Sequence, residues 1–129
     1  MTQSKRILIV EDEAVIALDL QKTLTDSGHA VVGIASTCEE ALQLAEFHRP
    51  DIVLMDYNLK GGLNGATTAR QLDFNKVRII FLTAYPVESV RESYGIDFEL
   101  LAKPVRRDEL RQMLATTKPL PLRGAHNPG

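Results

Sequence analysis

The sequence predicts an α/β fold: a five-stranded parallel sheet with the strand order 2-1-3-4-5, flanked by five helices. Two observations support this prediction. Short aliphatic runs recur along the 129-residue chain, and stretches with helical spacing of apolar residues separate them. Such alternation is typical of a parallel sheet that is covered by helices on both faces. Because crossovers between parallel strands are right-handed, few strand orders remain, and this one is favoured.

Each strand is predicted from a short run of aliphatic residues, the pattern of a strand buried on both faces. The expected strands lie at 7–10, 30–35, 51–56, 77–82 and 98–102. The expected helices lie around 16–24, 41–48, 66–72, 86–94 and 110–114. Gly28 is suited to stop the first helix. Thr37, followed three residues later by Glu40, has the pattern of a capping box that starts the second, and Pro50 ends this unit.

One domain is expected at residues 1–115, followed by a flexible tail at 116–129 that is rich in proline. This tail is too short for a DNA-binding domain, and the net charge of −2 argues against general affinity for nucleic acid. The first apolar run stops at Glu11, too early for a signal peptide or a membrane helix, so we expect a cytoplasmic protein without membrane insertion. The single cysteine, Cys38, cannot form an internal disulfide.

Polar residues gather where the predicted strands end. Glu11 and Asp12 follow the first strand, Asp56 ends the third, Thr83 follows the fourth, and Lys103 follows the fifth. Because the carboxyl ends of parallel strands share one edge, these five side chains are expected to converge there. Each acid by itself would be read as a helix-capping or solvated residue, and Thr83 and Lys103 singly as a turn hydroxyl and a surface lysine. The combination favours a functional site.

The chemistry of this set is specific. Three carboxylates held close together repel one another unless a cation joins them, and hard oxygen ligands of this kind suit Mg²⁺. A carboxylate is also a competent nucleophile towards phosphorus. The ammonium of Lys103 and the hydroxyl of Thr83 are suited to bind phosphoryl oxygens. Phosphoryl transfer needs little beyond such positioning and electrostatic stabilisation.

With these residues the chain resembles the response-regulator receiver domains of bacterial two-component systems. The matching motifs are Val10-Glu11-Asp12-Glu13, Met55-Asp56 with Asn58-Leu59, Leu82-Thr83-Ala84 and Lys103-Pro104. The resemblance covers about residues 5–115 and implies a flavodoxin-like receiver fold with Asp56 as phosphoacceptor. It implies Mg²⁺, with Mn²⁺ as a substitute, bound by Asp12, Asp56 and the backbone carbonyl of Asn58, and by Glu11 directly or through water. It also implies a cis peptide bond between Lys103 and Pro104.

One position departs from the family pattern and bears on the conformational switch. Many receiver domains carry an aromatic residue on the fifth strand, three residues before the lysine, and here that residue is Leu100. Tyr85 is either a substitute for this aromatic ring or a simple loop residue, and both readings stay open. We expect phosphorylation to draw Thr83 towards Asp56 and to shift Thr83, Ala84, Tyr85 and the helix that follows.

The predicted first helix is apolar beyond the needs of one buried face. Either both sides of this helix are covered, or Val15 and Leu18 form a docking patch next to Pro104 and Val105. The resemblance favours docking of a histidine kinase or a histidine phosphotransfer protein, with an unknown downstream partner. The chain is expected to be a monomer or a weak dimer, and it is either a stand-alone regulator or the receiver of a hybrid kinase.

Two other functions compete with this interpretation. A small phosphatase with an aspartyl nucleophile would need a second acid two residues after the nucleophile, where Asn58 stands. A flavodoxin-like binding module would need a loop rich in Ser, Thr and Gly after the first strand, where three acids would instead repel an anion. We therefore expect a phosphoacceptor signalling domain with at most slow autodephosphorylation, and not an enzyme.

Overall fold

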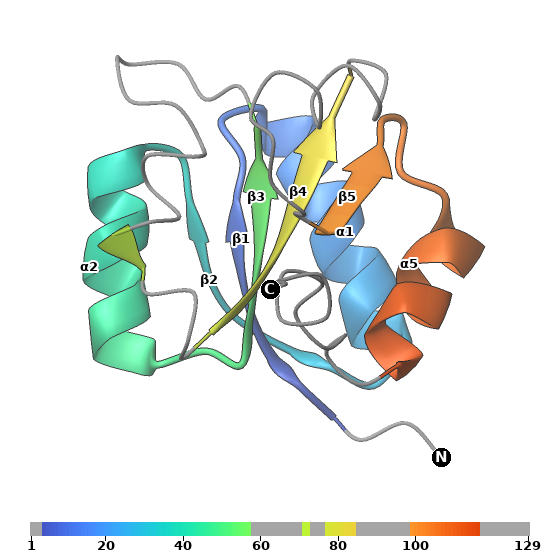
Figure 1. Cartoon of the computed structure of the whole chain (residues 1–129), viewed down its shortest axis with the longest axis horizontal. Helices are drawn as coiled ribbons and strands as arrows, with labels where there is room; N and C mark the ends of the chain where they lie inside the picture. Colours follow the sequence, from blue (N-terminus) through green and yellow to red (C-terminus); the bar gives the residue numbers. More distant parts are fainter. Residues whose placement is uncertain (1–3, 58–70, 73–76, 85–98, 117–129) are drawn as a thin grey trace, which may run out of the picture.

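The predicted parallel sheet and its strand order are confirmed. The computed structural model describes residues 4–57, 71–72, 77–84 and 99–116. Its elements are β1 (Arg6–Val10), α1 (Ala14–Asp26), β2 (Ala30–Ala35), α2 (Cys38–His48), β3 (Ile52–Asp56), β4 (Arg78–Thr83), β5 (Glu99–Ala102) and α5 (Arg107–Ala115). The five strands pair in parallel in the order β2-β1-β3-β4-β5 (Figure 1). The helix predicted around 86–94, and most of the one at 66–72, lie outside the described residues.

Helices cover both faces of the sheet, with α2 on one side and α1 and α5 on the other (Figure 1). The strands alternate strictly between two apolar clusters because successive side chains of a strand point to opposite faces. On the α2 side the buried strand residues are Leu8, Val10, Ala35, Val53, Met55, Ile79, Phe81 and Leu100. On the α1 and α5 side they are Ile7, Ile9, Ile52, Leu54, Ile80, Leu82 and Leu101. Burial on both faces explains why the strands read as continuous aliphatic runs.

The predicted helix boundaries are explained by local hydrogen bonds and backbone angles. Gly28 follows α1 with a φ of +90°, a conformation that glycine adopts without steric cost. At the start of α2, the Glu40 amide donates to the Thr37 hydroxyl at 3.1 Å, as a capping box requires. The Glu40 carboxylate accepts from the amide of Ser36 at 2.8 Å, so the return bond goes to the residue before the cap.

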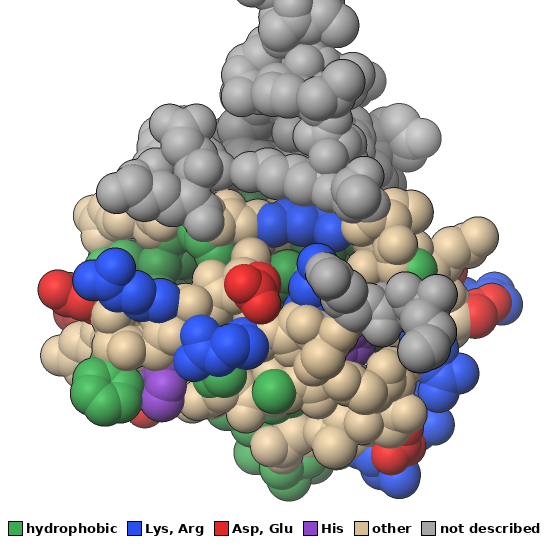
Figure 2. Space-filling model, turned by 90° about the horizontal axis from the view of Figure 1, so that it is seen from below, with side chains coloured by type: hydrophobic (Ala, Val, Ile, Leu, Met, Phe, Trp, Pro, Cys, Tyr) green, Lys and Arg blue, Asp and Glu red, His purple; other side chains and the backbone are tan. Residues whose placement is uncertain are grey.

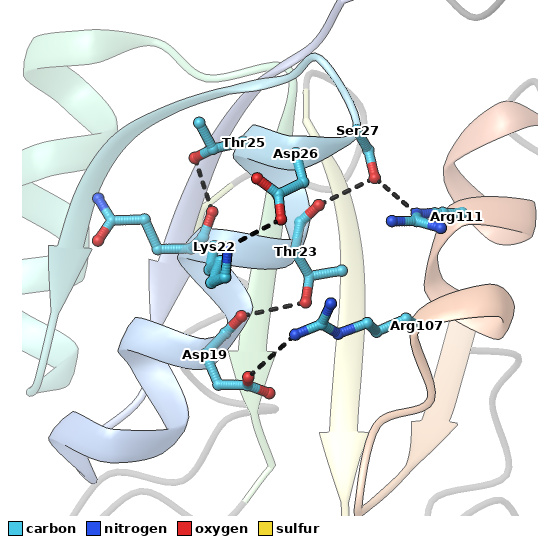
Figure 3. Close-up of polar contacts among 9 residues, drawn as sticks. Asp19, Lys22, Thr23, Thr25, Asp26, Ser27, Arg107 and Arg111 are labelled. Carbon is cyan, nitrogen blue, oxygen red and sulfur yellow. Dashed lines mark hydrogen bonds and ion pairs between the residues drawn. The ribbon is translucent and has the colours of Figure 1, made fainter.

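Polar contacts join α1 to α5 along their exposed sides (Figure 3). The Arg111 Nε donates to the Ser27 hydroxyl at 2.9 Å, and this hydroxyl donates to the Thr23 carbonyl at 2.9 Å. The Arg107 guanidinium lies 3.8 Å from the Asp19 carboxylate, and both side chains are more than half exposed. Such an exposed ion pair contributes about 1 kcal/mol or less. The apolar residues between the helices and the sheet therefore supply most of the packing energy. No described helix is both long and apolar enough to cross a bilayer.

Candidate functional site

The carboxyl ends of the strands lie at one edge of the sheet (Figure 1), and several of the predicted site residues end or directly follow these strands. Glu11 directly follows β1, and Asp56 and Thr83 are the last residues of β3 and β4. Lys103 directly follows β5. The registers align these ends, since Asp56 pairs with Leu82 and Thr83 pairs with Ala102. The topology thus brings together residues that lie far apart in the sequence.

Three acids form a close cluster. Glu11, Asp12 and Asp56 each offer a carboxylate oxygen, and these three oxygens lie within 4.8 Å of one another. The side chains of Glu11 and Asp56 are buried, with 2% and 6% exposed, whereas Asp12 is partly exposed. The cluster therefore opens towards solvent on the side of Asp12. Carboxylates this close repel one another strongly because little water separates them.

Lys103 is the counter-ion of this cluster. Its Nζ lies 3.1 Å from Glu11 Oε1 and 3.2 Å from Asp56 Oδ2. Burial lowers the pKa of Lys103, but the two carboxylates outweigh this effect and the pKa is raised. The lysine is therefore protonated at neutral pH. Among the described residues this ammonium meets three carboxylates, so this part of the site is rich in negative charge.

The pKa of Glu11 is raised, first because the carboxyl group is buried and also because the Asp56 carboxylate repels its charge. The amide of Glu13, which donates to Glu11 Oε2 at 3.2 Å, and the Lys103 ammonium act in the opposite direction. Glu13 itself is exposed and is the N-cap residue of α1. The buried Glu11 charge is thus only partly compensated by the protein.

The donor set fits a hard divalent cation. Three carboxylate oxygens within 4.8 Å of one another, with Asp12 partly exposed to solvent, are features that suit Mg²⁺ or Mn²⁺. Both ions prefer oxygen ligands and retain water molecules. The fourth predicted ligand, the carbonyl of Asn58, lies outside the described residues.

The main chain ties the ends of β4 and β5 together. The Lys103 amide donates to the Thr83 carbonyl at 2.7 Å, which continues the ladder past the last paired residue of β5. Thr83 is fully buried. The peptide bond between Lys103 and Pro104 is cis, as the resemblance implied. The structure thus places Thr83 and Lys103 side by side at the edge that carries the acids.

The predicted switch residues lie in different environments. Leu100 is buried in the cluster on the α2 side of the sheet, where it pairs with Phe81 of β4. Ala84 follows β4 directly and is exposed. Tyr85 lies outside the described residues, so its role stays a prediction.

The predicted docking residues border the same edge. Val15 and Leu18 are 81% and 59% exposed, so no described part of the chain covers these side chains. Pro104 is exposed, and Val105 is partly buried against α1 and α5. Of the two readings of this helix, the exposure favours a free apolar surface over a covered one.

Two polar arrangements were missed by the sequence reasoning. Arg78 and Glu99, at the starts of β4 and β5, form a largely buried ion pair with an Nη2 to Oε1 distance of 2.7 Å. His29 is buried and accepts a hydrogen bond at Nδ1 from the Lys5 amide at 3.0 Å. For the first arrangement, the signal in the sequence was a charged residue at the start of β4 and another at the start of β5. Both arrangements lie away from the acids.

Comparison with known proteins bears on this site. A family model described as the response regulator receiver domain matches residues 7–115. The transcriptional regulatory protein PdtaR of Mycobacterium tuberculosis is 35% identical over 111 residues, which cover 82% of this chain and 53% of that protein. Sporulation initiation phosphotransferase F of Bacillus subtilis is 32% identical over 124 residues, which cover 93% of this chain and 97% of that protein.

Solved structures show the same likeness. The response regulator PhyR of Brucella abortus superposes with a TM-score of 0.79 at 33% identity, over 88% of this chain and 47% of that one. The PhyR receiver domain of Erythrobacter litoralis gives a TM-score of 0.77 at 27% identity, over 91% of this chain and 95% of that one. The chain therefore spans about half the length of PdtaR and of the Brucella PhyR, and nearly all of the single-domain relatives.

Proposed function

Because the chain belongs to the response regulator receiver domains of two-component signalling, we propose that Asp56 accepts a phosphoryl group from a phosphohistidine donor. The observation that carries this proposal is the cluster of Glu11, Asp12 and Asp56 with Lys103 bound between two of the acids. An Asp56 carboxylate oxygen attacks phosphorus, and a P–O bond forms as the P–N bond to histidine breaks. The histidine nitrogen leaves with the electron pair and takes up a proton. The product is an acyl phosphate.

The neighbouring residues have distinct roles in this step. Glu11, Asp12 and Asp56 would hold Mg²⁺, which offsets the negative charge of the incoming phosphoryl group. The Lys103 ammonium, 3.2 Å from Asp56 Oδ2, is placed to pair with a phosphoryl oxygen. The Thr83 hydroxyl is the proposed donor to another oxygen, and its movement towards Asp56 is the proposed start of the switch through Ala84 and Tyr85. The domain acts as a stoichiometric acceptor with slow autodephosphorylation, and not as a turnover enzyme.

A direct test is incubation with acetyl phosphate and Mg²⁺, followed by intact-mass measurement. The wild-type chain is expected to gain a single phosphoryl adduct, and Asp56→Asn is expected to gain none. Asp26→Asn is the matched control, because Asp26 is exposed and pairs with Lys22 on the surface of α1. An adduct that persists in Asp56→Asn contradicts the assignment. Steady hydrolysis of phosphate esters without an adduct would favour the aspartyl phosphatase instead.

The donor is proposed to dock on Val15 and Leu18, next to Pro104 and Val105. Val15 is 81% exposed and lies in the first turn of α1, shortly after Glu11 and Asp12 in the sequence, and an apolar contact there would exclude water from the transfer step. Val15→Glu and Leu18→Glu should slow transfer from a phosphorylated histidine donor and leave labelling by acetyl phosphate unchanged. Phe47→Glu is the control, since Phe47 is also 81% exposed but lies on α2. Equal transfer in all three variants would rule out this surface.

A further inference from the structure

A second charged cluster lies at the opposite end of the sheet from the acids. The face at that end carries acidic and basic side chains close to one another (Figure 2). Arg78 at the start of β4 forms a two-pronged pair with Glu99 at the start of β5. Nη2 donates to Oε1 at 2.7 Å and Nε donates to Oε2 at 2.9 Å. The side chains of Arg78 and Glu99 are 7% and 19% exposed.

The same guanidinium also holds the end of α5. Nη1 donates to the Thr116 carbonyl at 3.1 Å, and Nη2 donates to the Met113 carbonyl at 3.0 Å. Carbonyls at the end of a helix lack intrahelical partners and carry the negative end of the helix dipole, so a buried guanidinium suits them. Arg78 thereby joins three elements that meet at this end: β4, β5 and α5. We call the group formed by Arg78 and Glu99 the basal clamp.

The register of β5 against β4 is only weakly determined by buried side chains. β5 has four residues and, among the described strands, lies at the edge of the sheet and pairs with β4 alone. Only two of its side chains enter the core, Leu100 on one face and Leu101 on the other. Side-chain direction has a period of two, so the register of a strand depends on which residues must be buried, and here few residues decide it. A salt bridge between the first residues of the two strands supplies a further constraint.

We propose that Arg78 is a positioning residue which, through Glu99, fixes the register of β5 and so holds Lys103 at the acids. Lys103 follows β5 directly, and its place between Glu11 and Asp56 depends on where β5 sits against β4. A shift of β5 along β4 would move the ammonium away from both carboxylates. The proposal rests on the proposed phosphoacceptor function for its catalytic consequence, but not for its structural one.

The test separates positioning from stability. Replacing Arg78 alone leaves the Glu99 charge buried, whereas Arg78→Met/Glu99→Leu removes both charges and is expected to recover stability. In the double variant we expect labelling by acetyl phosphate to be about tenfold slower, because a misplaced catalytic group costs rate even in a folded protein. We also expect faster hydrogen exchange at the Lys103 amide, which reports the bond to Thr83 directly. Lys22→Met/Asp26→Leu, which removes an exposed pair on α1, is the matched control.

Slower labelling together with faster Lys103 exchange in the double variant, but not in the control, supports the proposal. Wild-type labelling and exchange in the double variant overturn it, and so does equal slowing in the control. If the double variant does not fold, Arg78→Lys keeps the charge without the two-pronged geometry and should show the same faster exchange. If the wild-type chain forms no adduct, the proposed phosphoacceptor function is wrong. The exchange measurement still shows whether the basal clamp fixes the register of β5.

Discussion

The two ends of the sheet treat buried charge in opposite ways. At the carboxyl end, Glu11, Asp12 and Asp56 meet the ammonium of Lys103, which contacts two of these carboxylates. At the other end, the basal clamp matches one guanidinium with one carboxylate and adds two helix carbonyls as further acceptors. Among the described residues, the first arrangement gathers three carboxylates around one ammonium, whereas the second matches its charges one to one. Charge that the protein does not balance indicates a place for a ligand, whereas balanced charge indicates a structural role.

The largest expected effect comes from breaking the balanced end. Arg78→Met leaves the Glu99 carboxylate buried without its partner, which should reduce the free energy of unfolding by about 3–5 kcal/mol. Lys22→Met, which breaks the exposed pair with Asp26, should change it by about 0.5 kcal/mol or less. Urea unfolding with EDTA present measures both. A similar loss of stability in Arg78→Met and Lys22→Met would show that the basal clamp contributes no more than an exposed ion pair.

Removal of one charge from the acidic end should increase the free energy of unfolding rather than reduce it. Asp12→Asn removes one of three like charges and touches neither carboxylate that Lys103 holds. Without a divalent ion, we expect it to stabilise the fold by about 1–3 kcal/mol, the repulsion between charges some 5 Å apart. Urea unfolding in EDTA checks the sign. Destabilisation by Asp12→Asn in EDTA would show that the acids are already balanced.

Magnesium should stabilise the wild-type chain because it brings positive charge to three carboxylates that repel one another. At a concentration of about ten times its dissociation constant, a ligand of the folded state adds roughly 1.4 kcal/mol. Thermal unfolding should therefore shift upwards with MgCl₂ and return with EDTA. Asp12→Asn should lose most of this shift, and Arg78→Lys should keep it. A shift that is equal in Asp12→Asn would place the ion elsewhere.

The smallest expected effect is a pH dependence of stability that arises from His29. Burial, with the nearby Lys5 charge, lowers the pKa of His29 below its ordinary value of 6.5. The unfolded chain therefore binds this proton more readily, so stability is full above pH 6.5 and falls as the pH drops from there towards the lowered pKa. His29→Gln keeps an acceptor for the Lys5 amide and should flatten this part of the profile. Urea unfolding in EDTA at several pH values compares the two proteins, and identical profiles would exclude His29 as the cause.

The sequence predicted those parts of the structure that depend on local pattern. Aliphatic runs predicted the strands because burial on both faces leaves no room for polar alternation. The acids and Lys103 were predicted as one site because parallel strands end at a common edge, whichever residues lie between them. The predicted limits of the strands differ from the observed ones by about a residue. The fourth strand is predicted at 77–82, and β4 spans Arg78–Thr83.

What could not be predicted depends on contacts between distant segments. Arg78 and Glu99 lie 21 residues apart, and their pairing requires the register of β4 against β5. His29 meets Lys5 only because the loop after α1 returns to the start of β1. Neither contact leaves a periodic trace in the sequence. The proposed roles of Asn58 and Tyr85 stay predictions, because both residues lie outside the described part of the chain.

The 2.7 Å bond from the Lys103 amide to the Thr83 carbonyl uses only main-chain atoms. Any amino acid other than proline can donate it from the first position, and any amino acid can accept it at the second. Substitution of Lys103 or Thr83 can therefore abolish the proposed phosphoryl transfer while the ends of β4 and β5 stay aligned. A descendant that had lost the ability to be phosphorylated would still present the same folded surface to its partners, which opens an evolutionary route from a switch to a constitutive binding protein.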